Sequence, residues 1–430
     1  MGPERFMPCH KSREELEAEQ LTKLAASIRQ TYDNTRYYRA RCDAAGVRPE
    51  DLQSLADLAR FPFTKKSDFR ENYPFGMCAV PRESLVRIHA SSGTTGKPTI
   101  VGYTRNDLEL WDGLVARCLL AVGGRPDDII HNAFGYGLFT GGLGIHGGAQ
   151  QLGCAVVPAS GGQTERQLQL ILDLQPRIIC CTPSYLLVLA EALDKAGIDP
   201  RETSLEIGIL GAEQWSSEMQ REVETRSGVV ALDIYGLSEV MGPGVAIERA
   251  DARGHLTIWE DAFLPEIINP ETGESVPDGE PGELVLTSLS KEAVPIIRYR
   301  TSDLSRLSPP VGDIPMRLMD RIKGRNDDML IIRGVNIFPR QIEELILAEP
   351  GLSANYRIDV HRDGPREELV VTAEAAPGTG AEDQAAARAN LSHHMKSHYG
   401  LTARIVLAEI GTLPRSEGKA KRVFDHRMAL

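Results

Sequence analysis

The chain has 430 residues, 42% of them hydrophobic and 25% charged, with a formal net charge of −12. The length predicts two domains, and the composition is typical of a globular protein. Nucleic acid is excluded as a general partner, because neutralising its phosphates requires a basic face. No apolar run is long enough to span a bilayer or to form a signal segment, so we expect a cytoplasmic protein without a membrane partner. The seven cysteines show neither a CxxC pair nor metal-ligand spacing, which is typical of free thiols in a reducing compartment.

The elements predicted for the first part of the chain alternate between strands and helices. Residues 12–15 form the capping box Ser-Arg-Glu-Glu, and Leu21, Leu24 and Ile28 follow at helical spacing, which predicts a peripheral helix. Beyond it, the predicted strands are at 129–130, 155–157, 178–180 and 207–210, and the predicted helices are at 165–174 and 185–196. This alternation is typical of a parallel sheet covered on both faces.

The character of the sequence changes near Asn269, where turn residues become frequent and predict a β-rich subdomain with a strand at 283–286. The elements predicted after Gly324 are a strand (329–332), a helix (341–348), two strands (356–361 and 368–374), a helix (382–398) and a strand (402–407). We therefore expect an α/β fold. We expect a large N-terminal domain at residues 1–324. It would consist of parallel and mixed sheets packed with helices, and it would include the β-rich subdomain. A small, mobile α+β domain spans residues 325–430.

The strongest local motif is His-Ala-Ser-Ser-Gly-Thr-Thr-Gly-Lys-Pro at 89–98. Glycines let backbone N–H groups turn toward an anion, and the hydroxyls add donors, so the loop suits a triphosphate. It is not a Walker A loop, because Gly93 and Gly96 enclose only two residues and Pro98 follows Lys97. Taken alone, the motif is also compatible with a flexible surface turn.

This loop resembles the phosphate loop of the adenylate-forming superfamily, which comprises acyl-CoA synthetases, peptide-synthetase adenylation domains and luciferases. Four further motifs follow in the order of that family. They are Tyr-Gly-Leu-Ser-Glu (235–239), Tyr-Arg-Thr-Ser-Asp (299–303), Gly-Arg-Asn-Asp-Asp (324–328) and Pro-Arg-Ser-Glu-Gly-Lys (414–419). Two depart from the family pattern, with Ser238 in place of Thr and Ser302 in place of Gly. With the short chain, the segments 89–102, 132–144 and 233–244 look most like phenylacetate-CoA ligases, and the resemblance covers nearly the whole chain.

The resemblance implies ATP-dependent ligation of an aryl carboxylic acid, with phenylacetate as the best candidate, to coenzyme A. The reaction would pass through an acyl-adenylate and release AMP and pyrophosphate, with ATP and CoA as co-substrates and Mg²⁺ as the metal. The residues implied at the ATP site are Ser91, Ser92, Gly93, Thr94, Thr95, Gly96 and Lys97 at the phosphates, Gly211, Ala212, Glu213, Asp233, Tyr235, Gly236 and Ser238 along the nucleotide, Asp303 and Arg325 at the ribose, and Glu239 at Mg²⁺. Carboxylate and phosphate oxygens are ligands that Mg²⁺ prefers.

The same resemblance makes Lys419 the catalytic residue. Adenylation brings two anions together, so a positive charge between the acid and the α-phosphate would lower the barrier. By composition alone, Lys419 would be an exposed lysine in a basic tail. The preceding motif favours the catalytic interpretation.

Other assignments concern the acid, the hinge and CoA. Tyr136, Phe139 and Gly141 lie in a segment rich in glycine and aromatic residues, which with Gly211 predicts a pocket for a flat ring; the segment is also compatible with a buried helix start. Asp327 matches the hinge position about which the small domain would rotate between half-reactions. After that rotation, Arg333, Gly334 and Arg340 would contact CoA.

Several alternatives remain open at the level of sequence. The acid could be a benzoate or a substituted phenylacetate, and the enzyme could be an adenylyltransferase for another acceptor. A non-catalytic nucleotide-binding protein would not be expected to combine Glu239, Asp303 and Lys419. A homodimer is compatible with the sequence but is not predicted by any motif.

Overall fold

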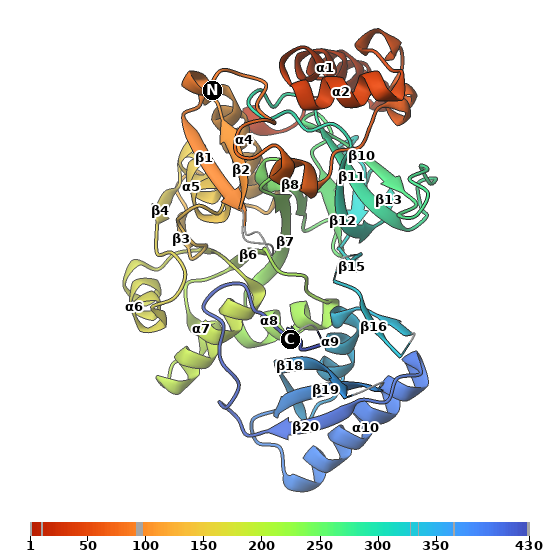
Figure 1. The fold of residues 1–430 in the computed structure, drawn as a ribbon. Coiled ribbons are helices and arrows are strands. Elements are labelled where there is room, and N and C mark those ends of the chain that lie inside the picture. Colours follow the sequence, from red (N-terminus) through yellow and green to blue (C-terminus); the bar gives the residue numbers. More distant parts are fainter. Residues whose placement is uncertain are drawn as a thin grey trace.

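The computed structural model describes residues 2–9, 12–91, 98–326, 328–333, 335–363 and 366–427. The elements up to β15 (Gly324–Arg325) form the larger part of the molecule, and those after it gather at one end, drawn in blue in Figure 1. Short 3-10 helices connect the larger elements at Pro3–Phe6, Pro49–Asp51, Leu55–Arg60, Arg82–Ser84 and Pro200–Glu202. Within the described residues, no helix is both long enough and apolar enough to cross a membrane.

The largest sheet lies at the centre of the larger part. Its strands are β3 (Ile129–Asn132), β4 (Ala155–Val157), β5 (Ile178–Cys181), β6 (Ile207–Gly211), β7 (Val230–Leu237), β8 (Gly242–Glu248), β9 (His255–Ile258), β13 (Leu307–Ser308) and β14 (Leu318–Asp320). They are ordered β13-β14-β9-β8-β7-β6-β5-β3-β4. Strands β3 to β7 pair in parallel, and the pairs from β7 to β13 are antiparallel.

Helices cover both faces of this sheet. They are α4 (Arg105–Ala121), α5 (Gly141–Leu152), α6 (Thr164–Leu174), α7 (Pro183–Lys195) and α8 (Ser217–Ser227). Alternate residues of β5 reach opposite faces: Ile178 packs in a core cluster with Val115 of α4, whereas Ile179 packs in another with Leu186 of α7. Continuous apolar runs buried on both sides are typical of parallel strands. The predicted α/β fold is therefore confirmed.

The β-rich subdomain is a four-stranded antiparallel sheet of β10 (Phe263–Ile268), β11 (Gly282–Ser288), β12 (Tyr299–Ser305) and β15. Helices α1 (Arg13–Asn34) and α2 (Arg36–Ala45) lie beside it in Figure 1, and Leu24 of α1 shares a core cluster with Leu264 of β10. The predicted N-terminus of α1 is confirmed, because Ser12 Oγ accepts a hydrogen bond from the Glu15 N–H at 3.2 Å. A hairpin of β1 (Arg87–Ser91) and β2 (Thr99–Tyr103) flanks the expected phosphate loop, and α3 (Lys66–Glu71) precedes it.

The small C-terminal part has a hydrophobic core cluster of its own. Its elements are β16 (Leu330–Ile332), β17 (Val335–Ile337), α9 (Pro339–Leu347), β18 (Leu352–Asp363), β19 (Arg366–Ala375), α10 (Ala381–Tyr399), β20 (Arg404–Ala408) and β21 (Val423–Asp425). The main sheet has the order β20-β19-β18-β21, in which only β18 and β19 are antiparallel. The predicted α+β architecture is confirmed, although β17 and β21 were not predicted. The expected domain boundary after residue 324 falls within β15 and stays a prediction.

Candidate active site

Side chains from three separate sequence motifs converge on one buried carboxylate. Asp303, on β12, is 4% exposed. The register of β12 and β15 pairs it with Arg325, whose Nη1 donates to Asp303 Oδ1 at 3.0 Å. Tyr235, on β7 of the large sheet, donates its hydroxyl to Asp303 Oδ2 at 2.6 Å. An ionised carboxylate is an acceptor on both oxygens, so Asp303 in this position suits a ligand that offers hydroxyl donors.

A second acidic group, Glu239, lies just beyond the end of β7 and is 4% exposed. Ser91, the last residue of β1, donates its hydroxyl to Glu239 Oε1 at 3.0 Å, and Lys66 Nζ lies 3.5 Å from the same oxygen. Beneath it, Lys291 is almost fully buried and donates to the Glu239 backbone carbonyl at 3.1 Å. Burial lowers the pKa of Lys291 to about 8. The carboxylate is thus fixed at the start of the expected phosphate loop.

The backbone of the nucleotide segments is unusual at positions that the motifs mark. Ser302, which stands where the family motif has glycine, has φ of +64°, in the left-handed region that favours glycine. Ala212, after the end of β6, has φ of +65°. A Cβ on Gly236 would lie 1.8 Å from the Gly242 carbonyl oxygen, so only glycine permits this approach of β8.

Asp233, two residues before Tyr235, has its carboxyl pKa raised to about 6 by burial.

The loop that carries Lys419 is held against the larger part through backbone groups on both sides of the lysine. Thr182, the N-cap of α7, donates its hydroxyl to the Gly418 carbonyl at 3.1 Å. Ala420 donates its N–H to Glu213, whose Oε1 also accepts from the Ser184 hydroxyl at 2.7 Å. Burial raises the pKa of the Glu213 carboxyl. Lys419 itself is exposed, and its backbone lies beside the segment that follows β6.

An ion pair reinforces this junction. Arg415 donates from Nε to Glu191 Oε2 of α7 at 2.9 Å and from Nη1 to Glu374 Oε1 of β19 at 2.8 Å. One guanidinium therefore joins the larger part to the small sheet. We call the three contacts Arg415–Glu191, Gly418–Thr182 and Ala420–Glu213 the interdomain latch.

The residues expected at the acid pocket differ in their surroundings. Tyr136 accepts a hydrogen bond from Asn132 Nδ2 at 2.8 Å, its hydroxyl lies 3.0 Å from His146 Nδ1, and burial raises its pKa to about 12. The Phe139 side chain is 57% exposed. Gly141 is the first residue of α5, and Ser238 Oγ lies 3.0 Å from Thr140 Oγ1 just before it. The acid segment and the nucleotide segment are thus in direct contact, whereas Phe139 is largely exposed.

The expected CoA residues are not brought to the Asp303 cluster. Arg333 donates to the Glu367 and Thr402 carbonyls within the small part, at 2.9 and 3.0 Å. Arg340 binds the Ile322 carbonyl and, at 3.1 Å, Glu344. The other expected site residues, Ser92, Gly93, Thr94, Thr95, Gly96, Lys97, Asp327 and Gly334, lie outside the described residues.

Sequence reasoning did not find the lysines beside Glu239 or the α7 residues that hold the Lys419 loop. Lysines are mostly exposed, and nothing in the local pattern marks Lys66 or Lys291 as partners of an acid. A signal did exist for Thr182, because a threonine between an apolar strand and a proline is a typical helix N-cap. Its second role, as a donor to the Gly418 carbonyl, depends on tertiary contacts.

Sequence profiles define the class to which these features belong. The profile described as AMP-binding enzyme matches residues 14–290, and that described as AMP-binding enzyme C-terminal domain matches residues 334–427. Phenylacetate-coenzyme A ligase of Aromatoleum evansii is 55% identical over 421 residues, which are 97% of this chain and 96% of the relative. The chain therefore belongs to the phenylacetate-CoA ligases, within the AMP-binding enzymes. An adenylyltransferase for another acceptor is not favoured by these relatives.

Solved structures of 2-hydroxyisobutyryl-CoA ligase also match the structure of this chain, and the TM-score depends on the catalytic state in which that enzyme was solved. In the postadenylation state with R3-HIB-AMP, that enzyme superposes with a TM-score of 0.91 at 26% identity, covering 99% of this chain and 92% of its own. In the thioesterification state with 2-HIB-AMP and CoA, the TM-score is 0.72 at 27% identity and the same coverage. The arrangement described here is therefore closer to the first state than to the second.

Proposed function

We propose that this protein ligates phenylacetate to coenzyme A in two half-reactions. ATP and phenylacetate first give phenylacetyl-adenylate and pyrophosphate, and the CoA thiol then displaces AMP. The observation that carries the proposal is the 55% identity to a phenylacetate-CoA ligase across nearly the whole of both chains. The convergence of the family motifs on Asp303 and Glu239 supports it.

In adenylation, a carboxylate oxygen of the acid attacks the α-phosphorus of ATP, and pyrophosphate leaves. We assign Asp303 to the ribose hydroxyls, because its two oxygens already accept from Tyr235 and Arg325 and can accept from ligand donors. Lys419 extends from a loop fixed by backbone contacts beside Glu213, where its ammonium would offset the repulsion between acid and phosphate. The phosphate loop, 91–97, would hold the β- and γ-phosphates.

The residues around Glu239 fit a magnesium ion. Its buried carboxylate and the Ser91 hydroxyl are oxygen ligands of the kind Mg²⁺ prefers, and the Lys66 ammonium already places a positive charge at Glu239 Oε1. When bound, the ion would neutralise charge on the phosphates. Glu239 would orient it, with its backbone carbonyl held by Lys291.

Thioester formation requires CoA to reach the face that the Lys419 loop covers in the arrangement described here. We propose that the small domain rotates near Asp327 and that the interdomain latch breaks as it does so. The TM-scores of 0.91 and 0.72 to the two states of 2-hydroxyisobutyryl-CoA ligase support this alternation. Rotation would bring Arg333 and Arg340 toward the site.

The experiment is a measurement of pyrophosphate release and thioester formation with CoA across a panel of acids. The panel holds phenylacetate, ring-substituted phenylacetates, benzoate and short aliphatic acids. We expect phenylacetate to have the highest kcat/KM and the product to be phenylacetyl-CoA. A higher kcat/KM for benzoate or an aliphatic acid would overturn the substrate assignment. A stable adenylate with CoA present would overturn the ligase assignment.

A further inference from the structure

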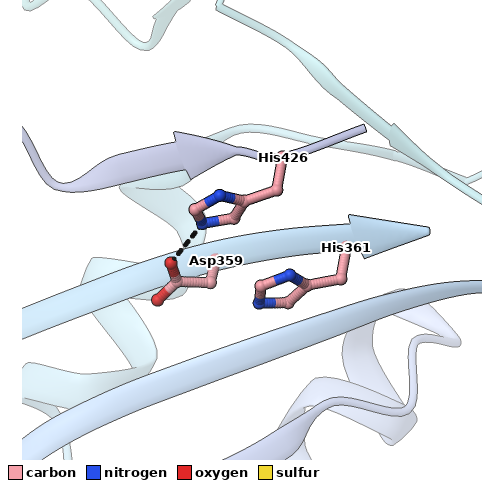
Figure 2. Close-up of side chains that lie close together, drawn as sticks. All are labelled: Asp359, His361 and His426. Carbon is pink, nitrogen blue, oxygen red and sulfur yellow. Dashed lines mark hydrogen bonds and ion pairs between the residues drawn. The ribbon is translucent and has the colours of Figure 1, made fainter. Parts of the chain in front are cut away.

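Three side chains with metal-binding atoms meet on the small domain's sheet, and none of them is among the expected ATP-site residues. They are Asp359 and His361 of β18 and His426, just after β21 (Figure 2). Each offers one ligand atom, and these atoms all lie within 4.8 Å of one another. His426 Nε2 lies 2.7 Å from Asp359 Oδ1. The two imidazole rings stack with centroids 4.5 Å apart and planes inclined by 3°.

The strand register assembles this group. The parallel pairing of β18 and β21 ends with Val360 opposite Asp425, and one further step sets His361 beside His426. The His426 N–H donates to the Val360 carbonyl at 2.8 Å, which fixes its backbone. Asp359 is two residues before His361 and so projects from the same face of the strand. Two of the three residues therefore lie on β18, and the third is hydrogen-bonded to that strand through its backbone.

The chemistry of the group suits a divalent transition metal. Two imidazoles and a carboxylate are ligands that Zn²⁺ commonly takes, with water in the remaining position. A histidine ligates a metal through a nitrogen lone pair that lies in the ring plane, so one of the two parallel rings would turn about its side-chain torsions for both to meet one ion. Magnesium, which prefers an all-oxygen shell, is a poor match.

Asp359 is also supported from outside the cluster. It is 7% exposed, and Arg357 Nη2 donates to its Oδ1 at 2.6 Å. The Arg357 guanidinium is itself stacked on the Phe424 ring, 4.1 Å from its centroid. Arg357 and His426 both contact Oδ1, so Asp359 can keep its hydrogen bond from Arg357 on that oxygen and offer Oδ2 to an ion. Such an outer partner orients a metal-binding carboxylate.

We propose that Asp359, His361 and His426 form a binding site for a divalent transition-metal ion, for which Zn²⁺ is the best match. The ion would join β21 to β18. Strand β21 has only three residues, and His426 follows Lys419 by seven positions. The ion would therefore anchor the C-terminal end of the segment that carries the catalytic lysine.

The test uses the full chain, freed of metal with a chelator and titrated with Zn²⁺ by calorimetry, without ATP or acid. We expect one equivalent to bind to the wild type. His361→Ala and His426→Ala should each weaken binding at least about tenfold. Co²⁺ should give the visible absorption of a low-coordinate nitrogen and oxygen site. The matched control is the double variant His394→Ala/His398→Ala, which removes the stacked histidine pair of α10, with centroids 5.5 Å apart. We expect it to bind Zn²⁺ as the wild type does.

Thermal unfolding separates loss of the site from loss of the fold. Metal-free His361→Ala should unfold at the wild-type temperature, and Zn²⁺ should raise the Tm of the wild type but not of the variant. Should His361→Ala unfold early, Asp359→Asn, which keeps the side-chain shape, takes its place. Absence of a saturable equivalent in the wild type would overturn the proposal. So would Zn²⁺ binding that is lost in the α10 variant and kept in the other two.

Discussion

The proposed alternation predicts that removing one charge from the interdomain latch separates the two half-reactions. Glu191→Gln keeps the shape of the side chain but removes the charge that Arg415 meets on α7. Arg415 donates to both Glu191 oxygens, at 2.9 and 3.3 Å, and the two side chains are 20% and 18% exposed. Glu374 would still bind Arg415 within the small domain, so of the two carboxylates that Arg415 contacts, the substitution changes only the one across the domain junction.

The magnitude follows from that geometry. A paired, charge-assisted contact that is mostly shielded from water contributes about 1–2 kcal/mol, more than a fully exposed pair. Since each 1.4 kcal/mol is a factor of ten, the equilibrium between the two orientations should move by about fivefold to thirtyfold. Adenylation, which needs the latched orientation, should slow by up to this factor. Thioester formation from supplied adenylate should stay constant or become faster.

The assay follows the two half-reactions separately. Adenylation is measured as phenylacetate-dependent exchange between ATP and pyrophosphate, and the second step as thioester formed from synthetic phenylacetyl-adenylate and CoA. The matched control is Lys195→Gln, because Lys195 Nζ lies 2.8 Å from Glu191 Oε1 within the same helix. It should leave both steps unchanged. Equal losses in both half-reactions of Glu191→Gln, or the same loss in the control, would refute the reasoning.

Four further outcomes are expected. Asp303→Ala should weaken ATP binding by about 2–4 kcal/mol, because it removes a charged acceptor; an unchanged calorimetric affinity would contradict its assignment. Lys419→Ala should slow adenylation by several orders of magnitude and spare thioester formation from supplied adenylate, and equal losses in the two steps would count against an adenylation-specific role. Tyr136→Ala should change the ranking of acids by kcat/KM more than it changes the KM for ATP. Phe139→Ala should change that ranking less than Tyr136→Ala does, because Phe139 is 57% exposed. A larger change in Phe139→Ala than in Tyr136→Ala would place the acid pocket elsewhere. Finally, the pKa of Glu191 is lowered, because hydrogen bonds from Arg415 and Lys195 outweigh its burial. The Arg415–Glu191 contact of the latch is therefore fully present above the ordinary pKa of a glutamate and is lost as the pH falls through the lowered value, whereas Glu213, whose pKa is raised by burial, is protonated at a higher pH. Adenylation should therefore decline on acidification before thioester formation does.

Strands and helices could be predicted where their own few residues show a recognisable pattern. Strand β5 is a continuous apolar run, and Ser12 and Glu15 form a capping box, so each was visible in its own few residues. Strand β21 was not, because three residues show no periodicity. It exists through its register with β18, which no local pattern encodes.

In the candidate site, too, some residues could be predicted from local motifs and others could not. Asp303 and Glu239 were named from the sequence because their motifs resemble those of the adenylate-forming family. Sequence could not show that the Glu213 side chain turns to Ser184 and the Ala420 N–H, since that contact joins residues 207 positions apart. Phe139 was expected at the pocket because glycines surround it. Its backbone neighbour Leu138 is held at the hairpin by the Ala90 N–H at 2.8 Å, and the ring is left exposed.

The two backbone contacts beside Lys419 have a practical consequence. Because Thr182 and Glu213 bind main-chain atoms of the neighbouring residues, the Cα of residue 419 is positioned independently of its own side chain. The length of the side chain at position 419 can therefore be varied while its Cα stays in place. Lys419→Cys alkylated with bromoethylamine carries an amine of lysine length, and shorter diamino acids would withdraw that amine one bond at a time. The dependence of the adenylation rate on this length would measure how far the reacting carboxylate lies from the backbone.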